Sequence, residues 1–221
     1  MSDPDHPLFA RLYDPVMAVP ERTLLAKHRQ YLVSGLSGRV LDLGAGTGGM
    51  FPYFADFSEP DFRVVAIEPD PHMRRQARER ASELAFDVQI DDACAEHLPY
   101  EDDSFDAVVA AFVFCTIPDV EAALSEVARV LRPGGEFRFV EHVRGDGPAG
   151  NVHDLLAPAW HAVAGGCHLN RDTGDRLLRD DRFTPTEFSR HDSGLSALVP
   201  VVRGTTVRKS DSTLQRLVGA L

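Results

Sequence analysis

The fold is decided by the stretch VLDLGAGTGG, residues Val40–Gly49. It opens with a short apolar run, typical of a buried parallel strand, and its three alternating glycines let the backbone turn tightly and approach a ligand. A glycine turn of this kind also occurs wherever a strand passes into a helix, so the turn alone is weak support for a ligand site. Asp42 is stronger support, because a carboxylate inside an apolar strand is costly unless it has a partner.

Strand and helix patterns alternate along the rest of the chain. One helix is expected to begin with Asp70 as its N-cap and Pro71 at its first position. Asp119 caps another helix, whose apolar residues fall on one face. Strands separated by helices predict an α/β fold, a Rossmann-like, doubly wound, mostly parallel seven-stranded sheet with helices on both faces. The expected strands are Arg39–Gly44, Arg63–Glu68, 87–90, 104–115, 136–142 and two weaker ones around 182–190 and 202–209.

An acidic residue lies at a second position where such sheets bind ligands, beyond the carboxyl ends of the strands. Glu68 ends the second expected strand, where a carboxylate can accept hydrogen bonds from both ribose hydroxyls of a bound nucleoside. The alternative for Glu68 is a solvated residue at a strand end. Together with Asp42 and the glycine turn, it favours a nucleoside site.

Composition narrows the class of protein. The 221 residues are 43% hydrophobic and carry a formal net charge of −11, which disfavours nucleic acids and anionic membrane surfaces as partners. Three cysteines, Cys94, Cys115 and Cys167, are too few and too scattered for a disulfide framework, so we expect a reducing cytoplasm. Acidic residues and prolines interrupt the apolar residues at the start of the sequence. This pattern predicts neither a signal peptide nor a membrane helix there. The sequence does not fix the oligomeric state.

Four motifs, in order, resemble those of the class I S-adenosylmethionine-dependent methyltransferases, over roughly residues 9–145. They are the glycine motif VLDLGAGTGG, the ribose-binding strand VVAIEPDPHM, the adenine loop and fourth strand AEHLPYEDDSFDAVVAAFVFCTIPD, and the last signature ALSEVARVLRPGGEFRFVE. The resemblance implies one methyltransferase domain over residues 1–221. Within it we expect an N-terminal helical lid (1–38), a donor-binding core (39–145), a substrate-side insertion (146–180) and C-terminal strands (181–221).

The resemblance also implies that the cofactor is S-adenosyl-L-methionine. FARLYDP resembles the family's lid, in which a residue like Tyr13 lies near the methyl end of the donor. Many relatives have Asp where this chain has Cys94, so the adenine amino contact is left to Asp92 or to a backbone carbonyl. The expected cofactor-binding residues are Tyr13, Asp42, Gly44, Ala45, Gly46, Gly48, Glu68, Pro69, Cys94, Ala95, Glu96 and Ala111.

The substrate side resembles the thiol-methyltransferase-like branch of the family. The matching residues include Glu141 and His142 at the end of the fifth strand and most of GGCHLNRDT, Gly165–Thr173. The resemblance implies a small apolar acceptor, such as a thiol, phenol or quinol. We expect Gly165–Thr173 to fold over the opening, with Arg171 anchored to a carboxylate such as Glu141 or Asp172. The expected substrate residues are Phe112, Phe114, Trp160, His168 and Arg171.

His142 is the candidate catalytic residue, because an acceptor hydroxyl or thiol must lose its proton and a histidine can accept it. The alternative is a strand-end histidine bonded to backbone. His168 could instead be a polar surface residue. Phe112, Phe114 and Trp160 could instead serve only to pack the core. Methyl transfer can also proceed by positioning alone, without an acid or base.

A metal site is not expected, because a zinc site needs four convergent ligands and the cysteines lack C-x-x-C spacing. Cys167 is expected to be a small packed residue rather than a reactive thiol. Two other functions stay open: a non-catalytic protein that binds S-adenosylmethionine, and a nicotinamide-dependent dehydrogenase. The dehydrogenase is disfavoured because no tyrosine has a lysine four residues on, as the short-chain type requires.

Charge composition yields one prediction. Lys27 and Lys209 are the only lysines, and such an acidic, arginine-rich chain is expected either in a salt-adapted cytoplasm or from a GC-rich genome. If the acidity is an adaptation, added KCl should keep raising the melting temperature beyond about 0.5–1 M, where ordinary charge screening saturates. Thermal melts up to about 3 M KCl check this; a flat or falling melting temperature would contradict the salt-adaptation hypothesis.

Overall fold

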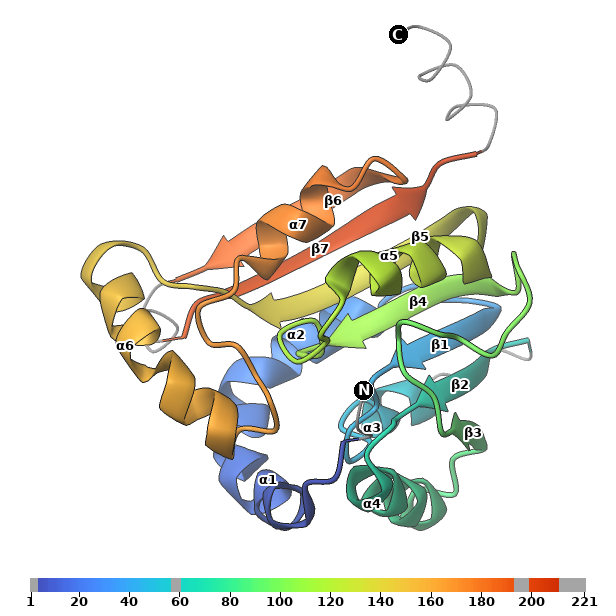
Figure 1. Ribbon diagram of the computed structural model, residues 1–221. Helices are drawn as coiled ribbons and strands as arrows, with labels where there is room; N and C mark the ends of the chain where they lie inside the picture. The colour runs from blue at the N-terminus through green and yellow to red at the C-terminus, as the bar shows by residue number, and fades with distance from the viewer. Residues whose placement is uncertain (1–3, 57–60, 193–198, 211–221) are drawn as a thin grey trace, which may run out of the picture.

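The computed structural model describes residues 4–56, 61–192 and 199–210. One mixed sheet runs through the middle of the molecule, with helices on both faces (Figure 1). Its strands are β1 (Arg39–Leu43), β2 (Arg63–Ile67), β3 (Val88–Asp91), β4 (Phe105–Ala111), β5 (Leu131–His142), β6 (Phe183–His191) and β7 (Val201–Arg208). The helices are α1 (Pro7–Pro20), η1 (Glu21–Leu25, a π-helical turn), α2 (Ala26–Val33), α3 (Phe51–Ala55), α4 (Pro71–Glu83), α5 (Val120–Val130), α6 (Gly147–Val163) and α7 (Thr173–Arg179).

The sheet has the order β3-β2-β1-β4-β5-β7-β6. Strands β1 to β5 pair in parallel, whereas β7 is antiparallel to both β5 and β6. The order reverses at β1 and β4, so the switch point at which such sheets bind ligands lies beyond the ends of these two strands. The prediction of a doubly wound, mostly parallel seven-stranded sheet is confirmed.

Apolar side chains fill both faces of the sheet. One core cluster joins the sheet to α5 and α7, through residues such as Leu124 and Leu177. The other joins it to α2, α3 and α4, through residues such as Leu32, Phe51 and Ala77. Because both faces are covered, the ends of the strands are the places left for a ligand. Helices α1 and α6 lie at the end toward which β4 and β5 point (Figure 1).

Two helix starts follow the capping rules that the sequence indicated. The Asp70 carboxylate accepts hydrogen bonds from the backbone N–H of His72 and Met73 at the start of α4. Asp119 accepts one from Ala122 at the start of α5. Each carboxylate satisfies amides that have no partner within the helix.

The structure corrects the expected extent of two segments. The fourth strand was expected to reach Cys115, but β4 ends at Ala111 because Phe112 has the left-handed backbone angle φ of 60°. The glycines of the segment 145–150 predict a flexible break after β5, but from Gly147 onward this segment forms the first turn of α6. Within the ranges that the structure describes, no helix is both long and apolar enough to span a bilayer.

Candidate active site

The glycine turn after β1 is shaped to admit a ligand. Gly44 has φ of 73°, and a Cβ there would lie 2.1 Å from the Val113 side chain, so only glycine fits. Gly46 has φ of 59°, and a Cβ there would meet nothing within 4 Å. The backbone at Gly46 therefore faces open space at the switch point, where a donor's methionine end can approach it.

Glu68 holds the turn in place from the end of β2. Its Oε2 accepts a hydrogen bond of 2.8 Å from the Gly46 N–H, and its Oε1 accepts one of 2.9 Å from the Asp70 N–H. Each carboxylate oxygen keeps a second lone pair, which is available to a ribose hydroxyl. Burial raises the pKa of Glu68 to about 7, against the lowering effect of these two backbone hydrogen bonds.

Asp42 and a buried arginine lie beneath the same turn. Asp42 is 1% exposed, and its Oδ2 has no hydrogen-bond partner among the residues described. Burial raises the pKa of Asp42 to about 7, and the positive charge of Arg29 opposes that rise. Arg29 is 4% exposed and pairs with Glu21. A Cβ on Gly49 would lie 3.0 Å from the Arg29 guanidinium, which shows how closely this cation approaches the turn.

Sequence reasoning missed Arg29 as a residue of the donor site. Arg29 lies in α2, outside every motif, and is one of three basic residues in that helix. The one signal that could have found it is its place in a helix otherwise expected to cover the core, where an unpaired cation is costly.

The first helix is tied to the glycine turn by polar contacts. Asp14 in α1 accepts a 2.6 Å hydrogen bond from the Thr47 hydroxyl and pairs with Arg80 of α4. Gln76 of α4 donates to the Ala10 carbonyl oxygen. Residues 7–33 form α1, η1 and α2, and these contacts join α1 to the glycine turn. The role of residues 1–38 as a lid stays a prediction. Burial raises the pKa of Tyr13 in α1 to about 12, so its phenol stays protonated at neutral pH.

The expected adenine-side residues lie between β3 and α5. Asp92 makes a bidentate pair with Arg74, with distances of 2.9 and 2.7 Å. Ala95 packs in the core, and the Glu96 carboxylate accepts a 3.4 Å hydrogen bond from the Asp119 N–H. The side chains of Asp92 and Glu96 are therefore engaged by protein groups. Adenine contacts by these residues, and by Cys94, Pro69 and Ala111, stay predictions.

A buried carboxylate shapes the loop after β4. Glu141, at the end of β5, is 0% exposed and accepts hydrogen bonds of 2.8 and 3.0 Å from the backbone N–H of Val113 and Phe114. The left-handed angle at Phe112 turns the chain so that both amides point at this carboxylate. Burial raises the pKa of Glu141 to about 7. The carboxylate thereby fixes the first turn of the β4–α5 loop.

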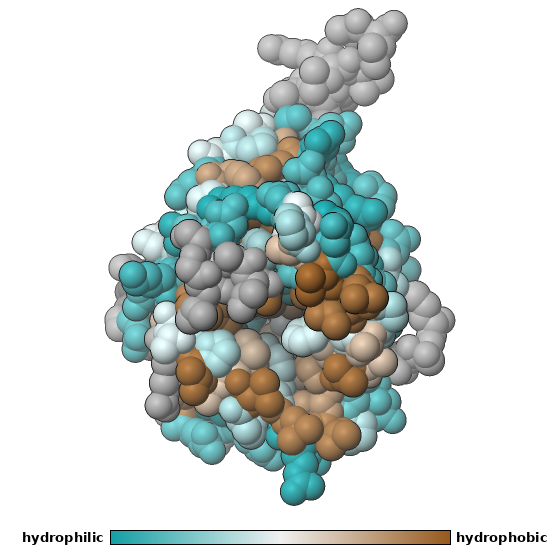
Figure 2. Space-filling view, turned by 90° about the vertical axis from the view of Figure 1, so that its left-hand side faces the viewer, coloured by the Kyte–Doolittle hydropathy of each residue, from teal (hydrophilic) through white to brown (hydrophobic). Residues whose placement is uncertain are grey.

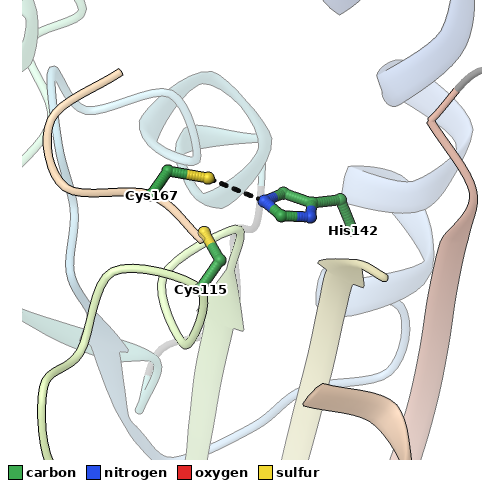
Figure 3. A group of neighbouring side chains, drawn as sticks. All are labelled: Cys115, His142 and Cys167. Atoms are coloured by element: carbon green, nitrogen blue, oxygen red, sulfur yellow. Dashed lines mark hydrogen bonds between the residues drawn. The ribbon is translucent and has the colours of Figure 1, made fainter. Parts of the chain in front are cut away.

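Three side chains from separate parts of the chain meet beside this loop; we call Cys115, His142 and Cys167 the Cys–His cluster (Figure 3). All three are buried, and their Sγ and ring-nitrogen atoms lie within 4.8 Å of one another. The His142 Nε2 is 2.8 Å from the Cys167 Sγ. Trp160 of α6 donates a hydrogen bond of 3.4 Å from its indole N–H to the same sulfur.

The electrostatics of the cluster single out Cys167. Hydrogen bonds from Cys115, His142 and Trp160 lower the pKa of the Cys167 thiol, although burial opposes the shift. The same contact raises the pKa of Cys115, which donates its proton to Cys167. Burial opposes charge on His142, but the hydrogen bond to Cys167 raises its pKa overall. Cys167 is buried, as expected of a small packed residue, and three donors also converge on its sulfur.

Two substrate-side expectations are corrected. Arg171 was expected to pair with Glu141 or Asp172, but its Nη1 donates to the carbonyl oxygens of Phe114 and Ile117, both at 2.7 Å. Loop carbonyls left without helix partners thus replace the expected carboxylate. Phe114 was expected to face the substrate, but it is 0% exposed and packs against Phe137 in the core.

The remaining substrate-side residues lie around the cluster. The segment Gly165–Thr173 folds back onto the β4–α5 loop, where the His168 N–H donates to the Cys115 carbonyl oxygen at 2.9 Å. The His168 ring lies 4.5 Å from that of His161. Phe112 is partly buried, and Trp160 is 43% exposed. Contacts of these residues with substrate stay predictions, as does the general-base role of His142, whose Nε2 is already engaged by Cys167.

Fold and site together define a Rossmann-like domain that binds a nucleoside at the switch point of its sheet. A family model described as a methyltransferase domain matches residues 41–139. Human thiol S-methyltransferase TMT1A is 34% identical over 178 residues, which cover 77% of this chain and 70% of the relative. A phosphatidylethanolamine N-methyltransferase of Cereibacter sphaeroides is 34% identical, with coverage of 69% and 76%. The chain belongs to the S-adenosylmethionine-dependent methyltransferase family.

A solved structure supports the fold assignment. The geranyl diphosphate C-methyltransferase of Streptomyces coelicolor, determined with S-adenosyl-L-homocysteine, superposes with a TM-score of 0.68. The two sequences are 18% identical, and the match covers 89% of this chain and 85% of that one. The protein is therefore a methyltransferase, and neither the dehydrogenase nor the non-catalytic binding protein is supported by these comparisons.

The hydrogen bonds at Glu68 predict how much this residue contributes to the affinity for the donor. Replacing Glu68 with alanine removes the acceptors for the ribose hydroxyls and releases the Gly46 amide. Hydrogen bonds to a charged group contribute about 1.5–3 kcal/mol, so the affinity for S-adenosylmethionine should fall roughly 10- to 100-fold. Calorimetric titration of both proteins with S-adenosylhomocysteine measures this. An unchanged affinity would remove Glu68 from the donor site.

A second prediction concerns stability against pH. Folding raises the pKa of Glu68 from 4.5 to about 7, so the folded state binds the proton more tightly than the unfolded state. Ionisation of Glu68 therefore lowers the free energy of unfolding as pH rises through this window, by at most about 1.4 kcal/mol per pH unit. Glu68→Gln lacks this dependence.

The measurement is denaturant unfolding of the donor-free wild type and Glu68→Gln at pH 4.5 and pH 8. From pH 4.5 to pH 8 the free energy of unfolding should fall by about 2–3 kcal/mol more in the wild type than in the variant. If the two proteins differ by the same free energy of unfolding at both pH values, burial does not raise the pKa of Glu68. Comparison of the two proteins cancels the titration of groups that do not interact with Glu68; Asp42 does interact with it, and its pKa should be lower in the variant.

Proposed function

We propose that this enzyme transfers the methyl group of S-adenosylmethionine to a small apolar thiol bound beside the Cys–His cluster. One observation carries the proposal: Cys115, His142 and Cys167 converge at the end of β5, next to the lid and the glycine turn. Polarisable cysteine sulfurs at that place suit a soft nucleophile such as the sulfur of an acceptor thiol.

Three observations support the placement of the cluster near the donor's methyl end. The loop that carries Cys115 packs through Val113 against the glycine turn at Gly44. Tyr13 of α1 lies near enough to Cys115 that a negative charge on this cysteine would raise the pKa of the phenol. On the other side of the cluster, the Phe9 ring of α1 lies 2.7 Å from where a Gly165 Cβ would be. Lid, turn and substrate segment thus meet around one point.

Apolar side chains gather on the outer face over this point (Figure 2). Leu12 and Val16 of α1 are 50% and 68% exposed, and Leu155 and Val163 of α6 are 80% and 70% exposed. Helices with such exposed apolar residues flank the way to the cluster. They favour an apolar acceptor over a charged one.

The reaction needs few catalytic groups. The acceptor S–H loses its proton, the thiolate sulfur attacks the methyl carbon in line, and the bond from that carbon to the donor sulfur breaks. The products are a methyl thioether and S-adenosylhomocysteine. Holding the two sulfurs and the methyl group in line contributes several kcal/mol, about 7–11 in well-oriented intramolecular reactions. We assign the acceptance of the acceptor's proton to His142.

The names of the relatives support a small acceptor without agreeing on the atom. Human TMT1A and TMT1B, which are 34% and 30% identical to this chain, are thiol S-methyltransferases. Other relatives are a phosphatidylethanolamine N-methyltransferase and a ubiquinone/menaquinone biosynthesis C-methyltransferase. A quinol is the second candidate acceptor for this chain. Scarce cysteine and an acidic composition support a cytoplasmic location.

An acceptor screen tests the proposal. The purified enzyme is incubated with methyl-labelled S-adenosylmethionine and matched series of small thiols, phenols, quinols and amines, and products are identified by mass spectrometry. Thiols with apolar substituents should be methylated faster than hydrophilic thiols and faster than oxygen or nitrogen acceptors of the same shape. Methylation of phenols or quinols but no thiol would overturn the acceptor class while leaving the methyltransferase assignment intact.

His142→Gln separates the acceptor side from the donor side. Loss of the imidazole should lower turnover of a verified acceptor by about 10²-fold, the usual contribution of a group that assists proton removal. Donor affinity should stay unchanged, because the ribose and glycine-turn contacts lie at β1 and β2. Steady-state kinetics and calorimetry measure the two effects. Full turnover in the variant would reduce His142 to scaffolding.

A further inference from the structure

We propose that the Cys–His cluster is a zinc site, held by Cys115 Sγ, His142 Nε2 and Cys167 Sγ, with its fourth position open to the acceptor. Sequence spacing predicted no metal site because the three residues are far apart along the chain. In space they meet, and all three are buried. The role given to the acceptor rests on the proposed function; the metal site itself does not.

The distances are those of a site that needs little rearrangement. Zinc binds thiolate sulfur at about 2.3 Å and imidazole nitrogen at about 2.0–2.1 Å, so tetrahedral ligand atoms lie roughly 3.5–3.8 Å apart. In the structure the His142 Nε2 and Cys167 Sγ are 2.8 Å apart, and no pair in the cluster exceeds 4.8 Å. Shifts of about an ångström, within reach of side-chain rotation, bring the three atoms to a common centre.

The backbone around the cluster is already fixed. The Cys115 carbonyl oxygen accepts from the His168 N–H at 2.9 Å, which joins the two cysteine-bearing loops. Arg171 clamps the β4–α5 loop from the other loop by its two 2.7 Å hydrogen bonds to carbonyl oxygens. The Cys167 N–H donates to the Ala164 carbonyl oxygen at 3.1 Å. Ligands held in advance in this way cost little ordering entropy on binding a metal.

The donor set selects a soft metal and leaves one position open. Two thiolates and an imidazole suit zinc, whereas magnesium and calcium prefer oxygen ligands. Three protein ligands with a fourth exchangeable position are characteristic of catalytic rather than structural zinc. The Trp160 indole N–H, 3.4 Å from the Cys167 Sγ, supplies the kind of outer hydrogen bond that orients a metal-bound sulfur.

An open zinc position gives the acceptor thiol a route to its reactive form. The R–S–H group binds through sulfur and releases its proton to solvent, because a thiol that coordinates zinc is deprotonated. The bound thiolate then attacks the methyl carbon, and the methyl thioether formed is a weaker ligand that leaves. Zinc is neither oxidised nor reduced. In this route His142 is a metal ligand, and proton release to solvent replaces the base role given to His142 in the metal-free mechanism, where Cys167 already engages its Nε2.

Metal binding is measured first, without donor or acceptor. Full-length enzyme, reduced and stripped with a chelator, is titrated with Zn²⁺ against a chromogenic competitor, and separately with Co²⁺ while absorption is recorded. We expect one tightly bound Zn²⁺ per chain. The Co²⁺ protein should show sulfur-to-cobalt charge-transfer bands and strong visible bands of a tetrahedral site.

Variants locate the ion. Cys115→Ser and Cys167→Ser should each weaken zinc binding by more than about 10²-fold, the upper effect of losing only an outer hydrogen bond. His161→Gln is the matched control: it removes an exposed histidine of α6 near the cluster and should leave zinc binding unchanged. Thermal melts of the metal-free proteins show whether each variant is folded. Zinc affinity that is equal in the wild type and both cysteine variants would overturn the site.

Turnover then tests the role. On a thiol that the screen has verified, the stripped enzyme should lose at least about 10²-fold in turnover and regain it on adding one equivalent of Zn²⁺. Donor affinity should be the same with and without metal. Equal turnover in both states would overturn the zinc role while the proposed thiol methylation stands. Tight zinc binding without turnover of any thiol would support the site and overturn the acceptor class instead.

Discussion

The site depends on the hydrogen bonds that the buried Glu141 carboxylate accepts from Val113 and Phe114. Those two amides follow the end of β4 and have no strand neighbour to bond, so without an acceptor each would cost about 1–3 kcal/mol in the interior. By accepting both, Glu141 turns the chain sharply at Phe112 and sets the path of the next three residues. Cys115 reaches His142 because of that path, and His142 is the residue next to Glu141 on β5. One carboxylate therefore determines both sides of the cluster.

The donor-binding end is organised by a parallel device on β2. Glu68 accepts from the Gly46 amide as Glu141 accepts from those of Val113 and Phe114, so in both cases an acid at a strand end fixes the loop after a neighbouring strand. Since strands in a parallel sheet end at the same edge, the two loops lie side by side, with the Val113 side chain against Gly44. The lid adds a third tie through Asp14 and Thr47. The two loops of the candidate site are thus fixed by the same kind of interaction.

The sequence was sufficient for what local rules determine. Buried strands, caps at Asp70 and Asp119, and the glycine turn each depend on a few neighbouring residues, and each was predicted correctly. What it could not supply were contacts between loops. Arg171 binds carbonyl oxygens rather than an acid, and no residue pattern marks which carbonyls a loop leaves free. Nor does spacing reveal that Cys115 and Cys167, more than fifty positions apart, meet at His142.

The buried acidic residues near the glycine turn are not expected to lower the barrier to methyl transfer. Burial raises the pKa of Asp42 and of Glu68 to about 7, so both carboxyls are partly ionised at neutral pH. Any negative charge that they carry favours a cationic donor at this edge of the sheet. The sulfonium charge disperses as the methyl group leaves, so this attraction is greatest before the reaction and weaker in the transition state. Interactions of that kind tighten binding without lowering the barrier from the bound state. The rate must then be gained on the acceptor side, through alignment and through the ionised state of the attacking sulfur. That is the side on which the structure gathers its two buried cysteines and His142.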